Sequence, residues 1–207
     1  RHERDRDDEE LEAFIMGMND IAQFGAQGML EALDLSPYRR FLDVGGGPAT
    51  YTIAFLEAHP EMCATVFDFP QVCNIGRRQV ERAGLVDRVT FVPGDLTQDP
   101  LAGGHDLVLV SNIIHSFGPE NCRRLVQKCF DALESGGMLI VKDFLMDPGR
   151  TGPAFGQIFA LHMLVMTGEG GTYTAEEVAE WTDAAGFAPG EYRDLTPQSR
   201  LWMARKP

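Results

Sequence analysis

Short apolar segments alternate with segments of helical spacing through most of the 207-residue chain, and this alternation restricts the fold more than any other feature. Strands are predicted at residues 40–44, 63–69, 88–95, 105–115 and 138–146, and helices at 11–33, 50–58, 71–84 and 119–137. Strands that alternate with helices form a parallel sheet covered by crossover helices. The sequence therefore predicts an α/β, Rossmann-like, doubly wound fold.

The C-terminal part departs from this alternation. A helix is predicted at 174–187, opened by Thr174 with Glu177 three residues later as a capping box. Two strand-like runs follow, at 187–195 and 199–206, with a short turn between them. We expect them to form an antiparallel hairpin that closes one edge of the sheet.

Acids and a histidine follow the predicted strands. In sheets of this kind, ligands bind beyond the carboxyl ends of the strands. The residues expected along that edge are Asp43–Gly47, Asp68, Asp95, Ser111–His115 and Asp143.

The first predicted strand runs into a glycine loop, "FLDVGGGPAT" at 41–50. Gly45 and Gly47 fit the dinucleotide pattern Gly-x-Gly-x-x-Gly, but Thr50 stands where the third glycine belongs. No Gly-Lys-Ser or Gly-Lys-Thr ending follows, which argues against a nucleoside triphosphate. A turn that only links strand to helix is the plain alternative.

Two acids narrow the choice of ligand. Asp68 ends the second strand about twenty residues after the loop, where a carboxylate can accept hydrogen bonds from ribose hydroxyls. A nicotinamide cofactor and an adenosyl cofactor both satisfy this pairing. Asp95, in "PGDL", offers a carboxylate and a neighbouring N–H that suit the edge of an adenine ring. Taken alone, Asp68 could also be a solvated strand end.

Four motifs in order, "LDVGGGPAT", "VFDFPQV", "VPGDL" and "SNIIHSFGPENC", resemble those of the class I S-adenosylmethionine-dependent methyltransferases, and within them the caffeate and acetylserotonin type of small-molecule O-methyltransferase. The resemblance implies a seven-stranded sheet, S-adenosyl-L-methionine as cofactor and a small, aromatic acceptor. It also implies a catalytic domain at 36–207, on which a helical segment at 1–35 packs. The family's N-terminal dimerisation domain is missing from this chain, and a homodimer is expected if the full-length protein has that domain.

The resemblance assigns cofactor contacts residue by residue. The glycine loop would face the methionine end of the cofactor, Asp68 its ribose, and Phe69 its adenine. The full set implied is Asp43, Gly45, Gly46, Gly47, Asp68, Phe69, Asp95, Leu96, Ser111 and Asn112. The chain departs from the family at Ser111, where a lysine is frequent, and at Ala49, where a glycine is frequent.

His115 matches the general base of the family, and Asp143 matches an acid that flanks it. An imidazole whose ordinary pKa is about 6.5 can accept a proton from a phenol near neutral pH. Thr172 occupies the position of a second flanking acid. A structural histidine and a solvated aspartate are the alternatives for His115 and Asp143.

The acceptor pocket is implied to include Phe14, Met18, His162, Met163 and Thr167. Met18 and Met163 could equally be core residues, as expected of Met16 and Met29. Alternative functions are C- or N-methyl transfer, cofactor binding without transfer, and an NAD-dependent oxidoreductase.

The charge, the apolar runs and the cysteines of the chain argue against several other kinds of protein. A formal net charge of −13, from 18 basic and 31 acidic residues, argues against a nucleic-acid partner. No apolar run is long enough to span a bilayer, and the charged start of the chain is not a signal peptide. Cys122 and Cys129, seven residues apart, are expected to be core thiols. No CxxC occurs among the four cysteines, so no metal site is predicted and a reducing cytoplasm is the expected setting.

Overall fold

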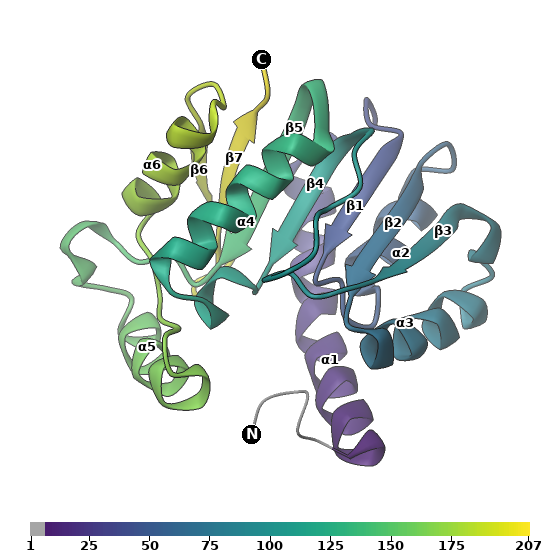
Figure 1. Cartoon of the computed structure of the whole chain (residues 1–207), viewed down its shortest axis with the longest axis horizontal. Coiled ribbons are helices and arrows are strands. Elements are labelled where there is room, and N and C mark those ends of the chain that lie inside the picture. Colours follow the sequence, from purple (N-terminus) through teal and green to yellow (C-terminus); the bar gives the residue numbers. More distant parts are fainter. Residues whose placement is uncertain (1–6) are drawn as a thin grey trace. The chain divides into compact units, whose positions relative to one another are not determined.

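The computed structural model describes residues 7–207 and arranges seven strands of this part of the chain in one sheet, in the order β3-β2-β1-β4-β5-β7-β6 (Figure 1). The helical segment expected at 1–35 lies partly outside the described residues. In chain order the elements are α1 (Asp8–Ala32), β1 (Arg40–Val44), α2 (Thr50–Ala58), β2 (Cys63–Asp68), α3 (Pro70–Arg82), β3 (Val89–Pro93), β4 (His105–Ser111), α4 (Pro119–Ala132), β5 (Leu133–Asp143), α5 (Ala154–Thr167), α6 (Ala175–Ala185), β6 (Glu191–Asp194) and β7 (Arg200–Arg205).

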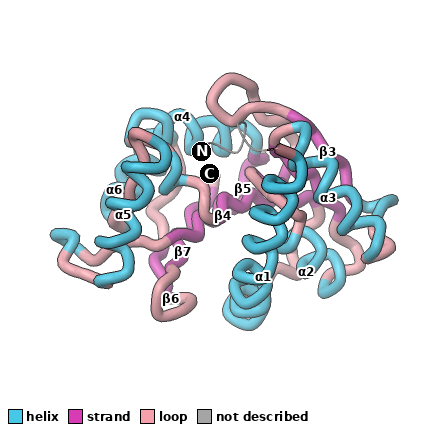
Figure 2. Tube along the Cα trace, turned by 90° about the horizontal axis from the view of Figure 1, so that it is seen from below, coloured by secondary structure: helices cyan, strands magenta, loops and turns pink. Residues whose placement is uncertain are grey.

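The chain divides into two compact units. The first ends at Pro100 and includes His105–Leu107, and the second consists of Leu101–Gly104 and Val108–Pro207. In the first unit β1 and β3 both pair in parallel with β2. Helix α1 packs beside α2, as Figure 2 shows, and also contacts α3. Phe41, Phe55 and Phe67 are fully buried in this unit and form the centre of its core.

In the second unit β7 pairs antiparallel with both β5 and β6. This arrangement confirms the α/β fold with a C-terminal antiparallel hairpin. Helix α4 packs on β5 and α6. Helix α6 begins with the predicted capping box, in which Thr174 and Glu177 each accept a hydrogen bond from the other's backbone N–H. Cys122 and Cys129 are buried free thiols, as predicted, and Met29 is a core residue of the first unit.

Several predicted boundaries are wrong, and two of the differences have a clear physical reason. The helix predicted at 119–137 ends at Ala132, and β5 begins directly at Leu133. The helix can end without its glycines because the Lys206 ammonium donates to the carbonyls of Phe130 and Leu133. The strand predicted at 105–115 ends at Ser111, because Asn112 adopts a left-handed backbone with φ 56°. Helix α5 was not predicted.

Candidate active site

The glycine loop after β1 turns sharply at Gly45, with φ 67°, and at Gly47, with φ 57°. The Gly45 N–H donates to the carbonyl of Phe67, which anchors the loop to β2. Ala49 also has a left-handed backbone, with φ 64°, at the position where the resemblance expects glycine. A Cβ at Gly46 would lie 2.8 Å from the carboxyl carbon of Asp43 and 2.8 Å from a methyl of Val66. The loop therefore needs glycine at 46 for space and at 45 and 47 for conformation.

Asp43 lies beneath this loop and is 1% exposed. Its Oδ2 accepts a hydrogen bond of 2.7 Å from the Thr52 hydroxyl on α2. Burial raises the pKa of the Asp43 carboxyl to about 6, although the Thr52 hydrogen bonds oppose this. Asp43 is therefore a buried structural residue next to Gly46 of the loop.

Asp68 joins the end of β2 to the glycine loop. One carboxylate oxygen accepts from the Gly47 N–H at 2.8 Å, and the other accepts from the Phe69 N–H at 2.7 Å. The structure thus brings together two of the predicted cofactor residues, Gly47 and Asp68. Phe69 is half-buried against the apolar cluster of Leu11, Ile15, Val72 and Ile75.

Asp95 and Leu96 lie in the turn after β3. The Asp95 carboxylate accepts hydrogen bonds from the N–H and the hydroxyl of Thr97, at 2.9 and 2.7 Å. The Asp95 N–H donates to the Asp99 carboxylate at 2.8 Å. The Asp95 carboxylate, which the sequence offered to an adenine edge, therefore takes part in the internal hydrogen bonds of this turn.

In the second unit, His115 and Asp143 form a buried pair. His115 Nδ1 lies 2.8 Å from Asp143 Oδ1, and the His115 N–H lies 3.4 Å from Asp143 Oδ2. Burial acts to raise the pKa of the Asp143 carboxyl, but the His115 ring, the Phe144 N–H and the Lys142 ammonium outweigh it, so the pKa lies below its usual range. An ionised Asp143 holds the proton of the ring on Nδ1 and leaves Nε2 as the acceptor.

His115 lies on a 3₁₀ turn, Ile114–Ser116, that several backbone contacts hold. Its carbonyl accepts from the Gly171 N–H at 2.9 Å. The Tyr173 hydroxyl donates to the Phe117 carbonyl at 2.5 Å, and the Cys122 thiol lies 3.3 Å from the Ile114 carbonyl. The turn is therefore fixed from α4 and from the segment between α5 and α6.

Aromatic side chains surround the His115 ring. The Phe144 ring stacks on it at a centroid distance of 6.0 Å, and Phe159 meets it edge-on at 5.0 Å. Phe155 packs against both phenylalanines. The sequence analysis missed these three, although Phe155 and Phe159 are four residues apart and so share one face of α5.

The predicted acceptor residues fall in different environments. Met163 is buried, and His162 is exposed with its ring 6.0 Å from that of Phe159. The Thr167 hydroxyl donates to the Met163 carbonyl and accepts from the Gly170 N–H, at 2.9 and 2.8 Å. In the first unit, Phe14 packs against the same apolar cluster as Phe69, and Met18 is 40% exposed.

Two further positions bear on the predicted site. The Ser111 hydroxyl is buried at the end of β4 and has no hydrogen-bond partner within the described residues. A buried hydroxyl of this kind can form a hydrogen bond to a ligand. The Thr172 hydroxyl donates to the Gly156 carbonyl on α5 at 3.2 Å. At the place of the family's second acid, this chain therefore has a buried structural contact.

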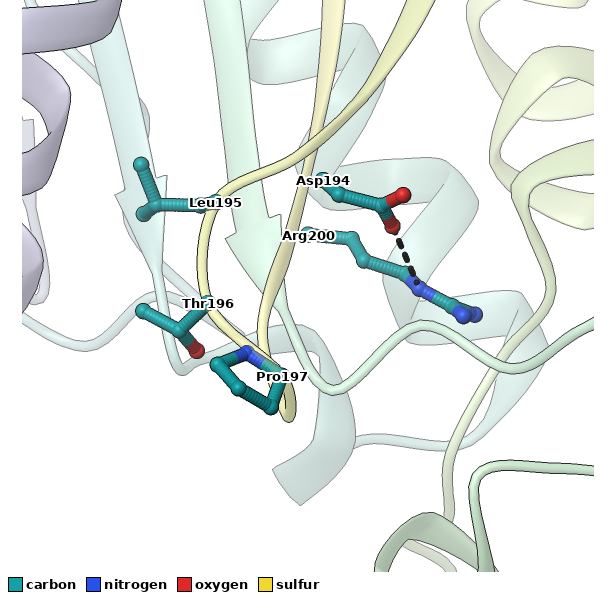
Figure 3. Close-up of a pocket in the computed structure, with 5 residues that line it drawn as sticks. All are labelled: Asp194, Leu195, Thr196, Pro197 and Arg200. Carbon is teal, nitrogen blue, oxygen red and sulfur yellow. Dashed lines mark hydrogen bonds and ion pairs between the residues drawn. The ribbon is translucent and has the colours of Figure 1, made fainter.

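A pocket of about 370 Å³ lies apart from these residues, at the turn between β6 and β7 (Figure 3). Arg200 is one of the five residues that line it, and the Arg200 guanidinium contacts the carboxylates of Asp194 and Asp147 and the Leu145 carbonyl. Residues 7–207 contain no cluster of three or more acids, cysteines or histidines arranged to hold a metal ion. No helix in the same range has the length and apolar character needed to cross a membrane.

Comparison with known proteins identifies similar chains. A family model described as an O-methyltransferase domain matches residues 2–188. The 3-hydroxy-5-methyl-1-naphthoate 3-O-methyltransferase of Streptomyces sahachiroi is 35% identical over 175 residues, 84% of this chain and 50% of that protein. The L-tyrosine C(3)-methyltransferase of Streptomyces lavendulae is 29% identical over 185 residues, 89% of this chain and 50% of that protein.

Among solved structures, human N-acetylserotonin methyltransferase in complex with SAM matches with a TM-score of 0.87 and 26% identity, over 97% of this chain and 57% of that one. The chain spans about half the length of the curated relatives it matches.

Proposed function

The chain belongs to the O-methyltransferase domain family, and from this premise we propose that it binds S-adenosyl-L-methionine and methylates a hydroxyl of a small aromatic molecule. The observation that carries the proposal is the buried His115–Asp143 pair with phenylalanine rings around it. A base that is held in one tautomer and lined by aromatic side chains suits the removal of a proton from a phenol.

The cofactor is proposed to bind through the residues that the motifs assign. The motifs assign to it the glycine loop, Asp68 with Phe69, and Asp95 with Leu96, all in the first unit. Ser111 and Asn112 are assigned by the motif that follows β4. In the first unit, the open space beside Gly47, where an added Cβ would meet no atom within 4 Å, leaves room for a group that approaches the backbone closely. In the second unit, the buried Ser111 hydroxyl offers a polar contact. When bound, S-adenosyl-L-methionine supplies an electrophilic methyl group on a sulfonium.

The residues of the chain then act on the acceptor. His115 Nε2 would take the proton of the acceptor hydroxyl and so make its oxygen nucleophilic toward the sulfonium methyl group that the cofactor would supply. Asp143 stabilises the imidazolium that results. The phenylalanine rings orient the flat acceptor and exclude water, and alignment of the reactants supplies much of the rate.

A second candidate is methyl transfer to carbon, because one relative is named for an L-tyrosine C(3)-methyltransferase. A carbon acceptor activated by a phenol also needs a base. The position of the new methyl group in the product distinguishes the two reactions.

The test has a binding arm and a catalytic arm. We expect calorimetry to detect binding of S-adenosyl-L-methionine and none of NAD. A methylation screen over phenols, indoles and polyketide-like aromatics, read by product mass, should find an acceptor. His115→Ala should lower turnover at least about 100-fold, whereas the control His59→Ala, at the end of α2, should not. Binding of NAD alone, or unchanged turnover in His115→Ala, would contradict the proposal.

The remaining expectations stay proposals. We infer a methyltransferase domain at 36–207 with a helical segment before it, a small-molecule acceptor as partner, and no nucleic-acid or membrane partner. Homodimers are proposed only for a full-length protein that carries the family's N-terminal domain. A cytoplasmic setting is supported by four free cysteines.

A further inference from the structure

Lys142 is a buried lysine that the proposed mechanism leaves unexplained. It lies on β5 directly before Asp143, and it is 3% exposed. Burial lowers the pKa of its ammonium, and the nearby Asp143 carboxylate opposes this effect. Burying a charged amine is costly unless it makes contacts that a neutral side chain cannot make.

Lys142 makes such contacts with Asn112. The Lys142 Nζ donates to Asn112 Oδ1 at 3.0 Å, and the Lys142 carbonyl accepts from the Asn112 N–H at 2.8 Å. Lys142 therefore holds both the backbone and the side chain of Asn112. Its Nζ also lies 5.8 Å from the centroid of the Phe144 ring, which stacks on His115.

Asn112 is the residue at which the chain leaves β4 and enters the turn that carries His115. It does so with φ 56°, a left-handed conformation that is uncommon for residues other than glycine. Asparagine adopts it more readily than other non-glycine residues, and the two hydrogen bonds to Lys142 hold Asn112 in it.

Two neighbouring residues of β5 thus form hydrogen bonds with the two ends of the segment 112–115. Lys142 holds its start at Asn112, and Asp143 holds the ring and the backbone N–H of His115. Successive side chains of a strand point to opposite faces, so neither residue can replace the other. The ammonium also contributes to keeping the Asp143 carboxyl ionised.

We propose that Lys142 is a positioning residue: through Asn112 and Asp143 it fixes the direction of the His115 ring and its Nδ1–H tautomer. The inference rests on the proposed role of His115 as the base. Lys142 touches neither the acceptor nor the cofactor in this account.

Three variants test the proposal. Lys142→Met removes the charge and the hydrogen bond but keeps an unbranched side chain of similar length, and Lys142→Arg keeps a cation and a donor. Lys206→Met is the matched control, because it removes a half-buried ammonium that caps α4 and leaves the His115 turn unchanged. Lys142→Leu, which also lacks the charge and the donor, replaces Lys142→Met if that variant does not fold.

The first readout is the ¹⁵N signal pair of the His115 ring, assigned with His115→Gln. We expect Lys142→Met to change the single-tautomer pattern of the wild type into a mixed one, and Lys142→Arg and Lys206→Met to retain it. The second readout is turnover. Lys142→Met should lose on the order of tenfold in kcat with less than about a twofold change in the acceptor KM, and Lys142→Arg should recover most of the loss.

Wild-type ring signals in Lys142→Met, or an equal loss of kcat in Lys206→Met, would overturn the inference. The ring signals need no substrate. If no acceptor is methylated, the proposed function fails while the signals still decide the role of Lys142. If methylation occurs and the signals do not respond, only the inference about Lys142 fails.

Discussion

At the scale of single residues, the three glycines after β1 have different physical reasons for being there. Gly46 has no room for a side chain because Asp43 and Val66 occupy the space, whereas Gly47 has open space around its Cβ position but a left-handed backbone. The sequence showed that the loop was rich in glycine. It could not show which glycine was needed for space and which for conformation, because that depends on Asp43 being buried.

Gly46→Ala should therefore be more harmful than Gly47→Ala. The first places a methyl within 2.8 Å of two side-chain carbons, and we expect a loss of about 2–3 kcal/mol in the free energy of unfolding. The second should cost about 1–2 kcal/mol for the left-handed backbone alone. Urea denaturation of both variants checks the order, and equal losses would contradict the steric explanation.

Asp43 gives a prediction about pH. Its pKa is raised to about 6 in the folded chain, against 3.8 for the ordinary group. Between these values the folded state keeps the proton and the unfolded state does not, so this group destabilises the fold as the pH rises through that range. Above about pH 6 this shift lowers the free energy of unfolding by about 3 kcal/mol.

Asp43→Asn keeps the size of the side chain and does not titrate. We expect the unfolding free energy of the variant, relative to that of the wild type, to rise between about pH 4 and pH 6 and then level off. Denaturation series at matched pH values measure this difference. A difference that stays constant with pH would show that Asp43 titrates as an ordinary surface acid.

At the scale of elements, the least expected feature is how the segment after α5 supports the His115 turn. The Gly171 N–H donates to the His115 carbonyl, and Gly170 packs so closely that a Cβ would meet that same carbonyl oxygen and the Thr167 hydroxyl. Helix α5 itself was not predicted because its sequence is apolar on all sides, and Ile158, Leu161 and Val165 are exposed. Periodicity identifies a helix only where a polar face contrasts with an apolar one.

Gly170→Ala should displace the His115 turn and lower kcat about tenfold or more, because a small misplacement of a catalytic group is costly. Gly171→Ala is the matched control, since nothing lies within 4 Å of the added methyl. Steady-state kinetics of the two variants tests the contact, and equal kcat values would count against it.

The capping box of α6 is an element that sequence analysis located correctly. Thr174→Ala removes the side-chain acceptor for the Glu177 N–H and should cost about 1 kcal/mol of stability. Thr151→Ala, at an exposed threonine, should cost much less. Thermal unfolding of both variants measures the two losses of stability. Similar melting temperatures would mean that the cap contributes little.

At the scale of the whole molecule, the alternation of patterns predicted the parallel sheet with its helices, and the two closely spaced C-terminal runs predicted the hairpin. The order of the strands in the sheet was not predicted, because it depends on long-range pairing that no local pattern records. The strand pattern alone placed His115 and Asp143 only near one edge of the sheet, and it was the family resemblance that implied an acid beside the histidine. The burial of this pair depends on Phe144, Phe159 and the segment around Tyr173, which no local pattern predicts.

The exposed apolar side chains of α5 should give this chain a measurable affinity for a hydrophobic dye. Replacing Ile158, 71% exposed, and Val165, 83% exposed, with lysine should reduce dye fluorescence without loss of helix content. Val86→Lys, at an exposed valine of the first unit, serves as the control. Unchanged fluorescence in the double variant would place the apolar surface elsewhere.

The carboxylate of Asp68 is already fixed by the Gly47 and Phe69 N–H groups before any ligand arrives. Its rotamer freedom is lost when the chain folds and not when a ribose hydroxyl binds. Preorganisation of this kind lowers the entropic cost of association, so affinity depends on the loop keeping its shape as much as on the acid itself. A substitution in the loop can therefore weaken ribose binding without touching the ribose.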